Sequence, residues 1–178
     1  VREGDAVKAG TPVFADKFSP EIIFASPVSG VVSEVVRGEK RKLLEIRIKT
    51  DKQIEYIKYD LPKVEDLSAE KIIEALKKSG LWVCLKQRPY GIIPNPNVEP
   101  KAIFVSGFSS VPAAPDYDYA LKDELDNIQL AINALNKLTK GGVHMGLSRI
   151  SANSTPLHKL KNVYFHVFDG PHPADNVG

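Results

Sequence analysis

The sequence predicts an α/β plus β protein, with a small β-rich module first and an α/β domain after it. The first observation is a strand, turn and strand pattern at 22–36, where β-branched and aromatic residues flank a turn that contains proline and glycine. The second is a set of apolar runs at 102–105, 143–147 and 163–168, the first two separated by residues with helical periodicity. We therefore expect two different kinds of sheet in one chain.

Length and composition bound the protein class. The 178 residues suit one large domain or two small ones, and 43% hydrophobic with 26% charged residues is ordinary for a soluble globular protein. The formal net charge of +2 gives no electrostatic case for nucleic acid. Cys84 is the single cysteine, which excludes an internal disulfide and a multi-cysteine metal site. No apolar run reaches the roughly 18 residues of a membrane helix, and the start at Val1 on a turn motif suggests a fragment of a longer protein.

We predict that residues 1–50 form the β-module. Its final strand alternates apolar and charged residues, which is typical of a sheet with one solvated face. The charge run at 37–42 is interpreted as a solvated hairpin turn, and the alternative is a contact with an acidic partner or a lipid surface. The expected strands are 12–14, 21–26, 30–37 and 43–49.

The turns of this module resemble those of biotinyl/lipoyl carrier domains, which have the barrel-sandwich hybrid fold. The resemblance rests on G-D-x-V-x-x-G at 4–10 and P-x-x-G-x-V at 27–32. Lys17 stands at about the place of a carrier lysine. We expect it to carry no prosthetic group, because Pro20 and the residues around it lengthen the turn and break its register.

Residues 51–67 are predicted to be a connector, and a helix is predicted at 68–79. Ser68 is a suitable N-cap, the apolar residues that follow recur at helical spacing, and Gly80 suits the position after the last turn. The next stretch, 81–100, holds four prolines and is predicted to be an ordered loop.

We expect residues 81–96 of that loop to pack against the α/β sheet near its strand ends. Trp82 should be largely buried, and its simplest role is to fill the core under the loop. Arg88 should bind backbone carbonyls or a carboxylate rather than a phosphate, since the glycines that allow close phosphate approach are missing.

Residues 68–178 are predicted to form a Rossmann-like α/β domain. Strands at 102–105, 143–147 and 163–168 should be buried on both faces, with a long helix at 118–139 between the first two. Such sheets bind ligands beyond the carboxyl ends of their strands. The segments expected at that edge are 106–108, 148–149 and 169–173.

Chemistry-bearing motifs are scarce. The loop at 107–110 is not G-x-G-x-x-G, and neither a serine nor a cysteine nucleophile motif is present, so no catalytic residue is predicted. The four histidines show no helical i, i+4 pair, so no metal site is predicted either. His166 is expected to be a hydrogen-bonded core residue, whereas His172, between two prolines at a strand end, is a candidate ligand contact.

The order of these segments is similar to one family, the A subunit of the bacterial sodium-translocating NADH:quinone oxidoreductase. The motifs that carry the resemblance are the turn at 4–10, R-G-E-K-R at 37–41, S-G-L-W at 79–82 with R-P at 88–89, and F-x-G-x-H-P-A at 168–174. It covers essentially all of this chain but leaves out the family's N-terminal start and its C-terminal third or more.

The resemblance implies a peripheral subunit on the cytoplasmic side of the bacterial inner membrane, bound to the other subunits of the complex. NADH, flavins and an iron–sulfur cluster are then expected in partner subunits and no cofactor in this chain, with ubiquinone as a ligand. The quinone-contact candidates are Trp82, Arg88, Tyr90, Phe108 and His172.

The same order of segments also resembles the flavin- and NADH-binding subunit of respiratory complex I. That relative has a glycine-rich loop after the helix and an acidic loop after the first sheet strand. This chain departs at both places, with bulky residues at 82–89 and no carboxylate at 108–111. We therefore predict that it binds neither FMN nor NADH. A flavin/NADH-binding enzyme domain and a carrier-type β-module remain the alternatives.

Overall fold

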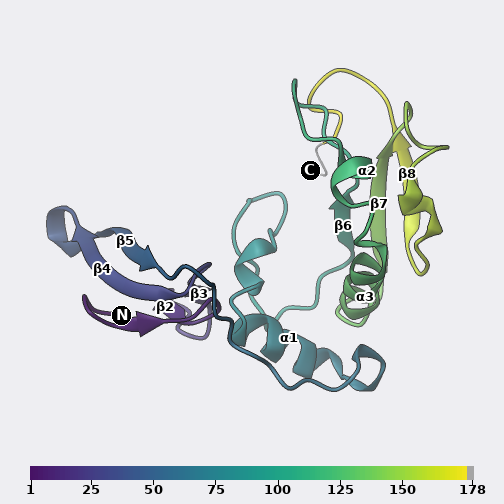
Figure 1. Cartoon of the computed structure of the whole chain (residues 1–178). Coiled ribbons are helices and arrows are strands. Elements are labelled where there is room, and N and C mark those ends of the chain that lie inside the picture. The colour runs from purple at the N-terminus through teal and green to yellow at the C-terminus, as the bar shows by residue number, and fades with distance from the viewer. Residues whose placement is uncertain (176–178) are drawn as a thin grey trace. The chain divides into compact units, whose positions relative to one another are not determined.

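The computed structural model describes residues 1–175, which fall into two compact units (Figure 1). The first unit comprises Val1–Leu61 and Ile73–Pro94, and the second comprises Pro62–Ile72 and the chain from Asn95 onward. These units follow spatial contacts, whereas the ranges predicted above (1–50, 51–67 and 68–178) follow the order of elements along the chain. Those ranges therefore stay a prediction.

The β-module of the first unit consists of two small antiparallel sheets. One has the strand order β1-β4-β5 and the other pairs β2 with β3. The four predicted strands are confirmed to within two residues at their ends, while β1 is a short strand where the sequence indicated only a turn. The strands are β1 (Ala6–Val7), β2 (Pro12–Ala15), β3 (Ile23–Ala25), β4 (Gly30–Arg37) and β5 (Leu43–Thr50).

Apolar side chains that point to the inner face of these strands form a small core. Val7, Val13 and Val32 are buried, and each buried valine contributes roughly 1.5–3 kcal/mol. Gly30 opens β4 at φ +152°, and a Cβ there would lie 2.1 Å from the carbonyl oxygen of Lys49. Only glycine therefore allows β5 to approach β4 this closely.

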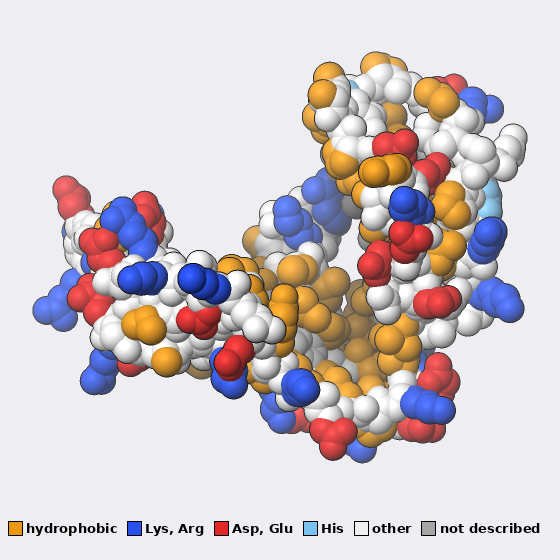
Figure 2. All heavy atoms as spheres, viewed as in Figure 1, with side chains coloured by type: hydrophobic (Ala, Val, Ile, Leu, Met, Phe, Trp, Pro, Cys, Tyr) orange, Lys and Arg blue, Asp and Glu red, His pale blue; other side chains and the backbone are white. Residues whose placement is uncertain are grey.

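Charges on the β4–β5 hairpin are mixed, as Figure 2 shows for this end of the chain. Arg47 on β5 contacts Glu34 at 2.6 Å and Glu45 at 2.9 Å. The predicted turn at 37–42 does join the two strands, through a 3-10 turn at Glu39–Arg41. Its residues are exposed or half-buried, as expected of a solvated turn.

The β2–β3 connection is a wide loop rather than a tight carrier-type tip. Asp16 Oδ1 accepts hydrogen bonds of 2.8 Å from the backbone N–H groups of Phe18 and Ser19, and the pairing resumes only at Ile22. This geometry supports the premise of the Lys17 prediction, which itself stays a prediction.

Helix α1 (Ala69–Lys78) confirms the predicted helix to within one residue at each end. Ser68 Oγ accepts from the backbone N–H of Lys71 at 3.4 Å, the pattern of an N-cap. Gly80 follows at φ +74°, where a Cβ would lie 2.7 Å from that of Ala25. The glycine thus both ends the helix and lets the chain lie against β3.

Residues 81–94 belong to the first unit, so this part of the proline-rich loop is grouped with the β-module and not with the parallel sheet. The expectation that residues 81–96 pack on that sheet stays a prediction. Its packing is local, because Trp82 is buried within the 3-10 turn Trp82–Cys84 and its Nε1–H donates to the carbonyl of Pro94 at 2.8 Å. The predicted burial of Trp82 is confirmed.

The second unit contains a parallel sheet in the order β6-β7-β8. Short helix α2 and longer helix α3 lie between β6 and β7, and a 3-10 turn precedes β8 (Figure 1). Among the described residues, no helix is both long and apolar enough to cross a membrane. The elements are β6 (Ile103–Ser106), α2 (Tyr117–Ala120), α3 (Leu125–Asn136), β7 (Val143–Ser148), the 3-10 turn Pro156–Lys159 and β8 (Tyr164–Phe168).

The single helix predicted at 118–139 is wrong, because the structure has two helices there. Asp116 caps α2 by accepting from the N–H groups of Asp118 and Tyr119, and Leu121 and Glu124 leave helical geometry at φ near −110°. Polar residues that favour helix starts interrupt the apolar repeat at this point, and side-chain capping competes with continuation of the helix.

The parallel sheet is covered on one face, which corrects the prediction that its strands are buried on both. Residues of α3, β7 and the turn before β8 form the buried core on that face. On the other face Phe104 and Tyr164 are exposed, and their rings stack on the His144 ring between them, with centroids 5.2 and 5.1 Å apart. His166 is exposed there too and bonds His144 at 2.9 Å, so it is not a core histidine.

Candidate functional site

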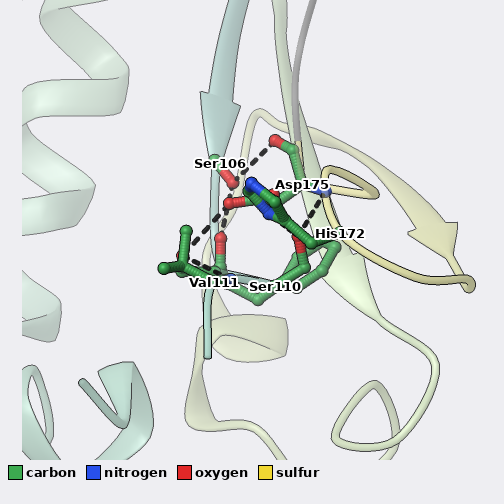
Figure 3. Close-up of polar contacts among 7 residues, drawn as sticks. Ser106, Ser110, Val111, His172 and Asp175 are labelled. Atoms are coloured by element: carbon green, nitrogen blue, oxygen red, sulfur yellow. Dashed lines mark hydrogen bonds and ion pairs between the residues drawn. The ribbon is translucent and has the colours of Figure 1, made fainter. Parts of the chain in front are cut away.

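A polar cluster lies at the carboxyl edge of the parallel sheet, where open α/β sheets bind their ligands (Figure 3). Ser106 ends β6, and Ser109 and Ser110 follow in the next loop. His172 and Asp175 come from the loop after β8. The cluster therefore joins two segments that are more than sixty residues apart in sequence.

The Asp175 carboxylate is the centre of the cluster. Ser109 Oγ donates to Oδ2 at 3.1 Å, and Ser110 Oγ donates to Oδ1 across a short contact. Ser110 Oγ also lies 3.0 Å from His172 Nδ1, and that nitrogen is 3.6 Å from Asp175 Oδ1. One hydroxyl thus bridges a carboxylate and an imidazole.

Hydrogen bonding also sets the charge of the cluster. The Ser110 hydroxyl, more than any other group, lowers the pKa of Asp175, and partial desolvation opposes this shift. Asp175 is therefore ionised at neutral pH, and its side chain is only 17% exposed. The carboxylate accepts hydrogen bonds and cannot donate one.

This arrangement is not a nucleophilic triad, although it contains serine, histidine and aspartate. In a triad the histidine accepts the serine proton and the carboxylate holds the other imidazole nitrogen. Here the Ser110 proton goes to Asp175 itself. These hydrogen bonds fix the orientation of the side chains in the cluster, which suits binding rather than bond cleavage. We call this cluster, made of Ser106, Ser109, Ser110, His172 and Asp175, the clamp.

Aromatic side chains adjoin the clamp. Phe108 lies two residues after the end of β6, and Ser106 Oγ donates a hydrogen bond of 2.7 Å to its carbonyl oxygen. The Phe168 ring covers Gly146, where a Cβ would lie 3.2 Å from that ring and 4.0 Å from the Phe108 ring. Val111, in the same loop, is 48% exposed. The edge thus combines a polar clamp with apolar surface, the usual composition of a small-molecule site.

Two family models cover most of the chain. The model of the NqrA N-terminal barrel-sandwich hybrid domain matches residues 1–51, and that of the NqrA second alpha/beta domain matches residues 67–178. The chain belongs to the NqrA family. The predicted resemblance is thereby confirmed, as is the fold class of a barrel-sandwich hybrid module followed by an α/β domain.

Curated relatives agree with the NqrA assignment. Proteins described as the A subunit of Na(+)-translocating NADH-quinone reductase are 36% identical in a serogroup A strain of Neisseria meningitidis, 35% in Histophilus somni strain 2336 and 36% in Yersinia pestis. Each match covers all of this chain but 40% of the relative. The chain thus spans well under half the length of the NqrA proteins that it matches.

The structure brings together two of the five quinone-contact candidates of this NqrA-family chain. The Phe108 carbonyl accepts a hydrogen bond from Ser106, and the His172 ring bonds Ser110, so both residues contact serines of the clamp. The other three lie in the first unit, where Trp82 is buried, Tyr90 is 73% exposed and Arg88 lies at the surface. No finding tests any of the five as a quinone contact, so their roles stay predictions.

Sequence reasoning missed the carboxylate of this site. The loop at 108–111 was predicted to lack a negative charge, yet Asp175 supplies one to Ser109 and Ser110. The available signal was weak but real, since Asp175 follows a strand end and the ends of parallel strands share one edge of a sheet. Ser106 lies in the segment 106–108 predicted at this edge, but its hydrogen bond to the Asp175 carbonyl was not predicted because the two residues are far apart in the chain.

A hollow of about 730 Å³ lies where β7 and β8 begin, away from the clamp. Lys137 lies in its wall, and its Nζ donates to the carbonyls of Val64, Glu65 and Leu67 at 2.7–2.8 Å. That ammonium has no hydrogen left for a ligand. Within the part of the chain described here, no group of three or more histidine, cysteine or acidic residues is placed to hold a metal ion.

Proposed function

We propose that this chain is part of a peripheral subunit of a sodium-pumping NADH:ubiquinone oxidoreductase, on the cytoplasmic side of the bacterial inner membrane. In this role it scaffolds other subunits and contacts quinone without a flavin of its own. The match to NqrA proteins named for the Na(+)-translocating NADH-quinone reductase carries the proposal.

The clamp supports quinone contact as the chemical part of this role. A quinone needs an apolar wall for its ring and a polar partner at each ring oxygen. Val111 is exposed and Phe108 is half-buried, so both present apolar surface, and His172 offers a polar atom held in place by Ser110. Trp82 is a weaker candidate, because its indole is buried and already bonded to Pro94. Arg88 and Tyr90 stay candidates in the loop of the first unit.

The loop after α1 supports the absence of a flavin. Flavin phosphates in such proteins are usually held by glycine-rich backbone at a helix N-terminus. Here the chain passes from Gly80 into a 3-10 turn whose Trp82 is buried. On this proposal NADH, the flavins and the iron–sulfur cluster belong to partner subunits, and the isolated chain is catalytically inactive.

Calorimetric titration of the purified chain with ubiquinone-1, FMN and NADH tests the proposal. We expect saturable binding of the quinone ligand, loss of at least part of that affinity in Phe108→Ala, and no saturable heat from either nucleotide. Phe104→Ala is the matched control, because Phe104 is an exposed aromatic residue on the open face of β6, the strand that precedes the Phe108 loop. Saturable FMN or NADH binding would instead support the flavin/NADH-binding enzyme domain.

A further inference from the structure

The clamp determines which nitrogen of His172 carries the proton. Ser110 Oγ donates its hydrogen bond to Asp175 Oδ1. The pKa of Asp175 is lowered, so the carboxylate is ionised and has no hydrogen to give. The single hydroxyl hydrogen of Ser110 is therefore already used.

Ser110 Oγ can then only accept from its other partners. His172 Nδ1 lies 3.0 Å from that oxygen, so Nδ1 must carry a hydrogen. A lone pair on Nδ1 would in addition face the carboxylate oxygen 3.6 Å away, which is unfavourable. A neutral imidazole that is protonated at Nδ1 has its lone pair at Nε2. Figure 3 shows the ring beside Ser110 and Asp175.

We propose that His172 Nε2 is the hydrogen-bond acceptor of this edge, and that the site prefers a reduced quinol to the oxidised quinone. A quinol carries hydroxyl hydrogens that Nε2 can accept, and a phenolic hydroxyl keeps its hydrogen at neutral pH. A quinone carbonyl has only lone pairs and would meet the lone pair of Nε2. This inference rests on the proposed quinone-contact function and adds the redox form of the ligand.

Nitrogen chemical shifts of histidine-labelled chain test the protonation pattern directly. At about pH 8, where an ordinary histidine is neutral, we expect His172 to be protonated at Nδ1. Ser110→Ala should shift the ring toward a mixture of tautomers. Ser109→Ala is the matched control, because it removes the other hydroxyl from Asp175 and leaves the Ser110–His172 contact intact. A native His172 protonated at Nε2 would overturn the proposal.

Anaerobic calorimetry with ubiquinol-1 and ubiquinone-1 at the same pH tests the preference. One net hydrogen bond corresponds to about tenfold in affinity, so we expect the quinol to bind about tenfold more tightly. His172→Gln should bring the two affinities together, because its amide can both donate and accept.

The same calorimetry separates failure of the quinol preference from failure of the quinone-contact function. Equal affinity of the native chain for both forms would refute the quinol preference and leave quinone contact standing. No binding of either form would refute the quinone-contact function and the preference with it.

Discussion

The two loops predicted to contact quinone differ in how their space is filled. In the loop at 81–94 the Trp82 side chain is buried and bonded to Pro94, so the interior of that loop is occupied by the protein itself. At the carboxyl edge of the parallel sheet, no bulky side chain plays the part of Trp82, and the loops are instead joined by small serine hydroxyls that bond the Asp175 carboxylate. Bulky residues stabilise a loop by filling it, whereas small polar residues leave atoms that a ligand can reach.

Truncation of Trp82 should produce the largest effect in this comparison. Trp82→Ala is expected to destabilise the first unit by about 3–5 kcal/mol, because it removes a buried aromatic side chain and leaves a cavity. Denaturant unfolding followed by circular dichroism measures this loss. Tyr90→Ala in the same loop is the control and should stay within about 0.5 kcal/mol, since Tyr90 is 73% exposed. Equal effects of the two changes would show that the loop is not filled from within.

A methyl group at Gly107 should disturb the carboxyl edge by a smaller amount. A Cβ there would lie 2.8 Å from the carbonyl oxygen of Gly146, which belongs to the backbone of β7 and cannot move freely. We expect Gly107→Ala to destabilise the second unit by about 1–3 kcal/mol and to weaken quinone binding. Unfolding and calorimetry on the same sample measure both, and an unchanged affinity would place the ligand away from this edge.

The clamp should also make stability depend on acid pH. Because the folded pKa of Asp175 is lowered, its contribution is present above the unfolded pKa of about 3.9 and is lost as pH falls through the folded value. Ser110→Ala should raise that pKa toward the ordinary value and weaken this dependence. Carbon NMR titration of the Asp175 carboxyl measures the shift.

Ser109→Ala is the control for this titration and should raise the Asp175 pKa less, since the Ser109 hydroxyl contributes less to the shift than that of Ser110. A larger effect from Ser109 than from Ser110 would contradict the bridging role assigned to Ser110.

At Lys17 we expect no covalent modification, and therefore no change in the mass of the chain. The wide turn made by Asp16 distinguishes this loop from a carrier tip. We therefore expect the intact mass of chain purified from a bacterium that makes both lipoate and biotin to equal the mass of the polypeptide. A mass increase of one lipoyl or biotinyl group, removed by Lys17→Arg, would support the carrier alternative.

Local patterns were sufficient for most elements of both units. The alternation in β4 and β5, the Ser68 cap and the glycine after α1 are each decided within a few residues, so their positions could be predicted closely. The turn at 4–10 and the short motifs at 37–41, 79–82, 88–89 and 168–174 likewise indicated the family. Such features depend on backbone preference and on the period of the apolar residues, and both can be recognised from residues that are close together in the sequence.

Other features depended on contacts between distant segments. The open face of the parallel sheet depends on what else packs there, whereas the helix break at Leu121–Glu124 is local and was hidden by a continuous apolar repeat. Ser110 and Asp175 meet only because β6 and β8 run parallel and deliver their loops to one edge. The sequence by itself determined α1, the family and the described strands other than the short β1, while only the tertiary structure placed a carboxylate against Ser110, since a side-chain hydrogen bond across 65 residues leaves no periodic signal in the chain.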